Sequence, residues 1–250
     1  QGQVYTAAMS AQYVIRAARC TLAGARALLA VERQTLRDSP YTADEILAVL
    51  RRPEHYAYVA TQADDVVGFC SCLETPTDEG NRLEIDMVGV LPEHRRRGLG
   101  TALITSGIRA ARQRGVRDFR SVVAIDNLAS RLAFRRAGLV ALSHPFRMIV
   151  YEITARRPVA FLPEGWTWQI ERDNPSNPPG DYGVLSARGG SHLEMHSLRG
   201  QDGTTRATAE CLEAHTLAYR GLWLEKLWGA SDRATKLVAR AIVERAKLLD

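Results

Sequence analysis

No stretch of this sequence is apolar for long enough to cross a membrane. Its apolar runs fall well short of the roughly 20 residues that a transmembrane helix needs, and its first residues lack the charged, apolar and small-residue regions of a signal peptide. Hydrophobic residues make up 46% and charged residues 24% of the 250 positions, as in globular chains. We therefore expect a cytoplasmic protein with no membrane partner and room for one large domain or two modest ones.

Cysteine is scarce and is not spaced for metal binding or redox chemistry. None of the four cysteines forms a CxxC pair, and Cys70 and Cys72 alternate within an expected strand. His192 and His196 are four residues apart, a spacing that suits a metal only on a helix, and they fall in a strand-like segment. We expect buried thiols in a reducing compartment and no metal site.

Lysine is nearly absent, since 3 of the 33 basic residues are lysines, and the formal net charge is +5. Arginines cluster between residues 109 and 120, but Phe119 is the one aromatic residue among them. A nucleic-acid partner is therefore not expected. A basic surface that attracts an acidic or phosphate-bearing molecule is the simpler interpretation.

The most informative segment is residues 88–101, with the sequence VGVLPEHRRRGLGT. An apolar, β-branched run ends at Pro92, a turn with three arginines follows, and helically spaced apolar residues begin after Gly100. This order predicts a strand, a glycine turn and a helix N-terminus, which together hold a phosphate on main-chain N–H groups. Gly98 and Gly100 have no Cβ, so the turn can adopt a positive φ and a ligand can approach its main chain closely. The segment fits neither GxxxxGK[ST] nor GxGxxG, which disfavours mononucleotide and Rossmann-type sites.

A second segment, residues 126–139, follows an apolar run at 121–125 and has the sequence DNLASRLAFRRAGL. Asp126 or Asn127 is a candidate helix N-cap, Phe134 stands at an apolar helical position, and Gly138 is a candidate C-cap. Taken alone, the segment predicts a short capped helix between two strands.

The two segments together resemble the GCN5-related N-acetyltransferase (GNAT) family. The matching residues are Arg95-x-x-Gly98-x-Gly100 in the first segment, and Asn127, Phe134 and Gly138-Leu139 in the second. The resemblance covers about residues 13–154, and a tandem member with a degenerate second half stays an alternative. It implies acetyl-CoA, or another acyl-CoA, as the cofactor, with its pyrophosphate on the glycine turn.

Hydrophobic periodicity predicts an α/β fold for the same region, with the element order β-α-α-β-β-β-α-β-α-β-β. Such an order favours a mixed sheet with helices on both faces, and the resemblance implies the same GNAT-like sheet. The expected divisions are a tag remnant or disordered arm at 1–11, an acetyl-CoA-binding catalytic domain at 12–156, and a C-terminal domain at 157–250. Strands are expected at 13–18, 56–61, 66–73, 83–90, 119–125, 139–143 and 148–153, and helices at 21–36, 42–52, 99–114 and 127–138.

Residues 157–250 predict a smaller α+β domain that is either accessory or a degenerate GNAT-like half. The pattern is strand-like near 166–168, 182–187 and 192–197, and becomes helical from Thr205 to a final amphipathic helix at 231–250. Residues 219–224 loosely echo the glycine turn, but Trp223 stands at the second glycine, so a second CoA site is not expected.

Two acidic residues are the candidate general bases for amine acetylation. Glu84 and Asp86 are two apart in a strand of otherwise apolar character, so they share a face, where burial would raise a carboxyl pKa. Glu84 also stands eleven residues before Arg95, the offset of the catalytic glutamate in GNAT histone-acetylating enzymes. Ion pairing with nearby arginines, a solvent-facing position or a water chain remain the alternatives.

The resemblance implies an oxyanion donor at the main chain of Val88, strand-like pairing of the pantetheine arm with Gly89 and Val90, and a bulge that Gly89 would ease. Many family members have a tyrosine acid at the position of Phe134, and a phenyl ring cannot donate a proton. Ser130 is a substitute donor, unless the thiolate leaves unaided. The predicted cofactor-binding residues are Val88, Gly89, Val90, Arg95, Arg96, Arg97, Gly98, Leu99, Gly100, Thr101, Asn127 and Phe134.

These inferences predict an acetyl-CoA-dependent N-acetyltransferase that moves an acyl group to a primary amine of a small molecule by direct transfer in a ternary complex. A protein amine or a charged tRNA stays open as the acceptor, and a homodimer stays open as the assembly. The alternatives are a noncatalytic acyl-CoA sensor, in which Phe134 marks lost chemistry, and a GNAT-fold enzyme with other acyl-thioester chemistry.

Overall fold

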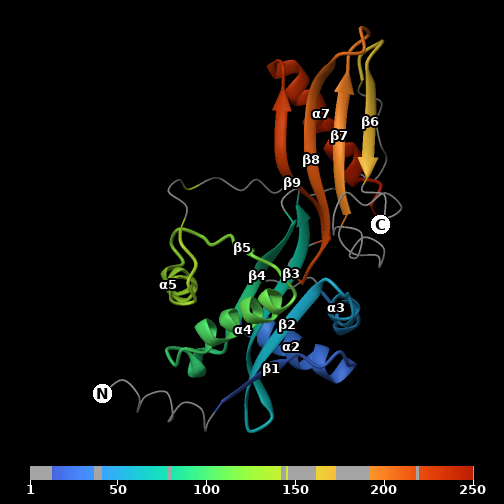
Figure 1. The fold of residues 1–250 in the computed structure, drawn as a ribbon. Coiled ribbons are helices and arrows are strands. Elements are labelled where there is room, and N and C mark those ends of the chain that lie inside the picture. Colours follow the sequence, from blue (N-terminus) through green and yellow to red (C-terminus); the bar gives the residue numbers. More distant parts are fainter. Residues whose placement is uncertain are drawn as a thin grey trace. The chain divides into compact units, whose positions relative to one another are not determined.

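The computed structural model in Figure 1 divides into two compact units. The first unit contains residues 1–145 and the short segment 216–218, and the second contains the remainder. The arm expected at 1–11, the strands expected at 148–153 and 182–187, and the domain limit near 156 lie outside the described residues. The structure describes residues 13–36, 41–77, 80–141, 145, 162–172, 192–217 and 220–249.

The first unit is built on a five-stranded sheet with the order β1-β2-β3-β4-β5. Strands β1 to β4 are antiparallel to their neighbours, whereas β4 and β5 are parallel. The mixed sheet predicted from the sequence is confirmed, although the strand expected at 119–125 is paired only over its beginning. The strands are β1 (Val14–Ala17), β2 (His55–Gln62), β3 (Asp65–Thr77), β4 (Gly80–Val90) and β5 (Asp118–Arg120).

Helices cover both faces of this sheet, as expected (Figure 1). Successive residues of a strand point to opposite faces, and Phe69 packs with helices α2 (Leu22–Thr35) and α3 (Ala43–Leu50), whereas Cys70 packs with α4 (Leu99–Gln113). The short turn η1 (Pro92–His94) precedes α4, and helix α5 (Leu128–Arg136) packs beside it. Within the described ranges, no helix is both long and apolar enough to span a bilayer.

The second unit contains an antiparallel sheet with the order β6-β7-β8-β9. Helix α7 (Asp232–Ala246) packs on one face of this sheet, where Val238 and Ile242 meet Ala209 and Cys211. The strands are β6 (Thr167–Arg172), β7 (His192–Arg199), β8 (Thr205–His215) and β9 (Arg220–Gly229).

The helical pattern expected from Thr205 onward is wrong up to residue 229, because this stretch forms β8 and β9. In β8, Ala207, Ala209 and Cys211 are buried at every second position, which is the period of a strand. Their alanines favour a helix by intrinsic propensity, and pairing within the sheet overrides that preference. The final helix begins directly after Ser231, as predicted.

The two units share one local arrangement. Asp86 is the extra residue of a β-bulge in β4, and Glu225 is the extra residue of a β-bulge in β9. Each bulged strand ends a few residues later, at Val90 and at Gly229. Each is then followed by a helix of 15 residues, α4 in the first unit and α7 in the second. That the second unit is a degenerate GNAT-like half stays a prediction.

Candidate active site

Strands β4 and β5 separate after a short stretch of pairing. Glu84 and Arg120 form the last parallel pair, and Ser121 then donates a hydrogen bond from Oγ to the carbonyl oxygen of Ile85 over 2.7 Å. Residues 121–124 continue without strand pairing. Beyond Ile85, β4 therefore has a strand neighbour on the β3 side alone among the described residues.

The main chain of β4 presents free groups along this open edge. The N–H of Leu91 bonds to the carbonyl of Val67 in β3 over 2.9 Å, which marks these two residues as a hydrogen-bonded pair. Because such pairs alternate along an antiparallel ladder, Val88 and Val90 are non-hydrogen-bonded positions, opposite Cys70 and Gly68. Their N–H and C=O groups point away from β3 and toward the open edge.

The glycine turn lies at the end of that edge. Gly98 has φ +78° and is the N-cap of α4, and Arg96 has φ +60°. The positive φ expected in the turn is therefore found at Gly98, whereas Gly100 already belongs to α4. The first helical hydrogen bond runs from Ala102 to the Gly98 carbonyl. The N–H groups of residues 99–101 therefore have no partner within the helix, and they lie at its positive end.

Three exposed arginines surround the turn. Nε of Arg95 donates a hydrogen bond to the Val90 carbonyl over 2.9 Å. The guanidinium of Arg97 lies 5.9 Å from the centre of the Tyr13 ring, and the Tyr13 hydroxyl is 3.1 Å from Nδ1 of His94. These contacts gather positive charge at the helix end, where a diphosphate would bind most favourably.

Glu84 lies between two guanidinium groups. Arg82 donates to one carboxylate oxygen, and Nε of Arg120 donates to the other over 2.9 Å. The side chain is 16% exposed. The ion pair between Arg120 and Glu84 joins β5 to β4 at the point where the strands separate. Glu84 therefore has the arginine partners that were one of the alternatives to a role as the base.

Asp86 has a different environment, although it is only two residues away. Both carboxylate oxygens are inaccessible to solvent and lack a hydrogen bond of regular geometry, while other atoms of the residue remain partly exposed. Burial raises the pKa of Asp86 to about 6, against the opposing effect of nearby hydroxyls of Ser71 and Thr216 and of main-chain N–H groups. A carboxyl group with such a pKa can accept a proton near neutral pH.

The expected link between Gly89 and the bulge is wrong, because the bulge occurs at Asp86. The missing side chain of Gly89 is instead required by packing: a Cβ there would lie 2.4 Å from Oγ1 of Thr35 and 2.7 Å from Cε1 of Phe69. Gly89 is also opposite Phe69 in the ladder, so its main chain faces β3 and not the open edge, where pairing with a pantetheine arm was expected. Sequence patterns carried no signal for a bulge at Asp86.

Helix α5 holds the remaining predicted residues. Oδ1 of Asn127 accepts a hydrogen bond from the N–H of Ser130 over 3.1 Å and caps the helix, and the Ser130 side chain is half-buried. Phe134 is 9% exposed and packs in the core with α4, so its packing role is confirmed. Ala133 of the same helix lies over Gly100, where an added Cβ would meet it at an ordinary 3.8 Å.

The second unit does not repeat these features in its described part. Two residues, Ala230 and Ser231, connect β9 to α7, whereas residues 91–98 connect β4 to α4. Oγ of Ser231 accepts from the N–H of Ala234 over 3.2 Å, so a side chain already occupies the helix N-terminus. The segment around Gly221 and Trp223, whose sequence loosely resembles the glycine turn, lies inside β9.

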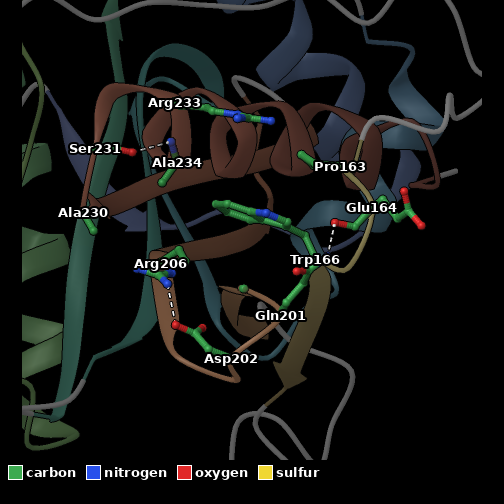
Figure 2. A pocket seen from close by; sticks show the side chains of 11 residues that line it. Pro163, Glu164, Trp166, Gln201, Asp202, Arg206, Ala230, Ser231, Arg233 and Ala234 are labelled. Carbon is green, nitrogen blue, oxygen red and sulfur yellow. Dashed lines mark hydrogen bonds and ion pairs between the residues drawn. The ribbon is translucent and has the colours of Figure 1, made fainter.

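A pocket of about 560 Å³ lies within the second unit. Figure 2 shows the Trp166 indole lying across it, between the first turn of α7 and the turn that joins β7 to β8. Arg206 and Asp202 on its wall form an ion pair at 2.6 Å. None of the polar atoms lining it is both buried and unpartnered, and none of the predicted site residues contributes to it.

A buried polar network also lies between the second sheet and α7. Arg245 donates to both carboxylate oxygens of Glu194 at 3.1 Å from Nε, and Nε of Arg172 adds a bond of 2.9 Å. Nε1 of Trp168 can only donate and lies 3.2 Å from Nδ1 of His196. His196 therefore carries its proton on Nε2, which lies 3.1 Å from Glu194. Among the described residues, no cluster of His, Cys, Asp and Glu could hold a metal ion.

Comparison with solved structures finds acetyltransferases that align with a little over half of this chain. An aminoglycoside acetyltransferase, meta-AAC0020 from an uncultured soil metagenomic sample, was solved with trehalose; it aligns with a TM-score of 0.52 at 14% identity, over 58% of this chain and 99% of its own. Its complex with sisomicin aligns equally well at 15% identity. The aminoglycoside N-acetyltransferase AAC(6')-Iy in complex with CoA aligns with a TM-score of 0.46 at 19% identity, over 57% of this chain and 95% of its own.

At such identities the likeness to meta-AAC0020 shows a shared fold alone. No protein of curated function matches this chain. The sequence profile of the acetyltransferase (GNAT) family matches residues 16–139, a range that contains the open edge of β4, the glycine turn and α5. Residues 16–139 therefore form a domain of the GNAT acetyltransferase family.

Proposed function

We propose that this protein is an acetyl-CoA-dependent N-acetyltransferase that acylates a primary amine of a small molecule by direct transfer in a ternary complex. One observation carries the proposal: the free main-chain edge at Val88 and Val90 continues into the open N-terminus of α4. An extended ligand with amide groups along its arm and a diphosphate at its end is complementary to this line of donors and acceptors. Acyl-CoA has that chemistry, and it is the cofactor of the GNAT family.

The residues present fit this cofactor. The main chain of Val88 and Val90 can pair with the pantetheine amides, and the N–H groups of residues 98–101, with the charge of Arg95 to Arg97, can hold the diphosphate. When bound, acetyl-CoA supplies a thioester carbonyl that is open to attack by an amine. The N–H of Val88 is a suitable donor to the oxygen that gains negative charge during attack.

Asp86 is the better candidate for the base that takes the proton from the amine. Its pKa of about 6 leaves it mainly ionised at neutral pH, yet basic enough to accept a proton. Glu84 is held by two guanidinium groups, and it would have to give up these hydrogen bonds to reach an amine. We assign Glu84 to the join between β4 and β5, and Asp86 to proton transfer.

A noncatalytic acyl-CoA sensor is the second hypothesis, and Phe134 favours it. This residue has no hydroxyl group, and it stands where many family members have the acid that protonates the thiolate. The hydroxyl of Ser130 is the substitute proton donor within α5. Under the sensor hypothesis the same surface binds the cofactor, but no amine is acetylated.

The decisive experiment measures release of free thiol from acetyl-CoA with a panel of primary amines, which includes aminoglycosides because meta-AAC0020 is an aminoglycoside acetyltransferase. We expect turnover with at least one small amine, and mass spectrometry should show one added acetyl group. Asp86→Asn should lower kcat by about 100-fold or more and leave CoA affinity unchanged. Glu84→Gln is the matched variant, which should retain most of kcat.

Tight CoA binding without turnover on any amine would instead establish the sensor. Release of CoA from malonyl-CoA with a decarboxylated product would establish other acyl-thioester chemistry. Turnover on a protein amine or a charged tRNA, but on no small amine, would overturn the acceptor class.

A further inference from the structure

Two polar side chains that the proposed mechanism does not use meet inside the first sheet. Ser71 on β3 is fully buried, and His55 on β2 is 6% exposed. Oγ of Ser71 lies 2.8 Å from Nε2 of His55. Buried hydroxyl and imidazole groups are costly unless they are paired, so this contact accounts for one ring nitrogen and leaves the Ser71 hydroxyl with further hydrogen-bonding capacity.

The β-bulge brings Asp86 to this pair. In a bulge, two residues of one strand oppose a single residue of its partner. Here Asp86 is the extra residue between the pairs Cys72–Ile85 and Ser71–Met87, so it lies directly beside the residue that pairs with Ser71. The Ser71 hydroxyl accordingly lies close enough to lower the pKa of the Asp86 carboxyl. Without the bulge, Asp86 would have a partner in β3 and would occupy a regular ladder position. With it, Asp86 has no such partner.

The groups that act on Asp86 are neutral at neutral pH. They are the hydroxyls of Ser71 and Thr216, the main-chain N–H groups of Asp86 and Met87, and the thiol of Cys72. The guanidinium groups of Arg82 and Arg120, on strands β4 and β5, are bonded to Glu84 instead. Hydroxyl donors therefore decide how strongly the buried carboxylate is stabilised.

The tautomer of His55 determines where the Ser71 proton points. Burial, with the nearby charge of Arg52, lowers the pKa of His55 to about 3, so the ring carries one proton at neutral pH. Nδ1 is buried and has no hydrogen-bond partner. An unpaired N–H is rarer in native structures than an unpaired acceptor, which favours the proton on Nε2, where Ser71 can accept it.

Resting on the assignment of Asp86 as the base, we propose that Ser71 and His55 are positioning residues for that carboxylate. Nε2–H of His55 donates to Oγ of Ser71, and the Ser71 hydroxyl then donates its proton to a carboxylate oxygen of Asp86. This chain orients the carboxylate and stabilises its ionised form without itself being protonated or deprotonated. His55 acts through Ser71 and touches no reactant.

The test compares Ser71→Ala with the conservative variant Ser71→Thr. Removal of the hydroxyl should raise the Asp86 pKa, move the acid limb of the kcat/KM profile up by about one pH unit, and leave KM for acetyl-CoA unchanged. Ser71→Thr keeps a hydroxyl and should restore the wild-type profile. Ser106→Ala, which removes another buried serine hydroxyl from α4, is the control and should shift nothing.

A second readout does not depend on catalysis. Carbon NMR of protein labelled at aspartate carboxyl groups follows the Asp86 titration directly, with Asp86→Asn identifying the resonance. Ser71→Ala should raise that pKa, also in a Thr216→Val background, where the other hydroxyl cannot replace the lost donor. An Asp86 titration unchanged in the double variant would overturn the proposal. If the titration shifts while no amine is acetylated, the positioning contact stands and the proposed function fails.

Discussion

Arg95 is hydrogen-bonded through Nε to the carbonyl oxygen of Val90 over 2.9 Å. This bond joins the glycine turn to the last residue of β4 and occupies the one main-chain acceptor at that end of the open edge. The N–H of Val90 and both main-chain groups of Val88 remain for a ligand. The phosphate end and the arm end of the proposed site are thus held together by the protein itself.

Gly98→Trp should abolish CoA binding because the indole blocks the binding site, and not merely because the substitution strains the backbone. The residue has φ +78°, so any side chain there costs about 1 kcal/mol or more in stability, and this side chain also covers the N–H groups of α4. Gly115→Trp is the matched control, because Gly115 has φ +90° at the other end of α4 and open space around its Cβ position. Calorimetric titration should show wild-type affinity for Gly115→Trp; equal loss in both variants would contradict the site.

CoA should bind with a stoichiometry of one per chain. The second unit has two residues between its bulged strand and α7, and Ser231 already caps that helix, so no turn is left to hold a diphosphate. Calorimetry on the whole chain measures this number directly. A second equivalent of bound CoA, or CoA binding that survives Gly98→Trp, would refute it.

Gly89→Ala should destabilise the first unit by about 1–3 kcal/mol. Its Cβ would overlap Thr35 and Phe69, and Phe69 is fully buried in a close-packed core. Gly100→Ala is the control with the same chemical change, since its Cβ meets only Ala133 at 3.8 Å, and alanine favours a helix. In urea denaturation, the free energy of unfolding of Gly100→Ala should equal or exceed that of the wild type. Equal destabilisation of the two variants would show that packing does not require a glycine at position 89.

Asp86→Asn should become more stabilising as the pH rises. Because burial raises the pKa of Asp86 to about 6, above its unfolded value near 3.8, the stability contributed by this group is fully present below about pH 4 and is lost as the pH rises through 6. The difference in unfolding free energy, variant minus wild type, should grow by up to about 3 kcal/mol between about pH 4 and pH 7.5. Parallel urea titrations at both pH values measure it, and a constant difference would argue against a buried ionised Asp86.

Arg245→Met should destabilise the second unit by about 3 kcal/mol. Burial alone would raise the pKa of Glu194, but hydrogen bonds from His196 and Arg245 and the charge of Arg172 outweigh it and lower the pKa to about 2. Without Arg245 this buried carboxylate loses its best partner. Arg206→Met is the control, because its exposed pair with Asp202 should contribute less than about 1 kcal/mol. Denaturation followed by tryptophan fluorescence distinguishes the two, and similar losses would contradict the network's role.

Local sequence patterns were sufficient to predict most of the helices and strands of the first unit. Thr42 and Glu45 form the capping box of α3, and the positive φ of Gly98 follows from the turn that its neighbours require. The same reasoning failed in β8, where alanines at alternate positions favour a helix by propensity and become strand residues only through pairing with β7 and β9. Strand identity there depends on neighbours that are distant in sequence.

The sequence alone determined the glycine turn, the helix behind it and the acidic pair on β4, because each depends on residues within a few positions of one another. Tertiary structure decided the different environments of the two acids, on which the proposed roles rest. Arg82 and Arg120 pair with Glu84, whereas the bulge in β4 leaves the carboxylate oxygens of Asp86 buried near the hydroxyls of Ser71 and Thr216. The environments of the two acids differ because of the strands that lie beside β4, and no local sequence pattern encodes the order of strands in a sheet.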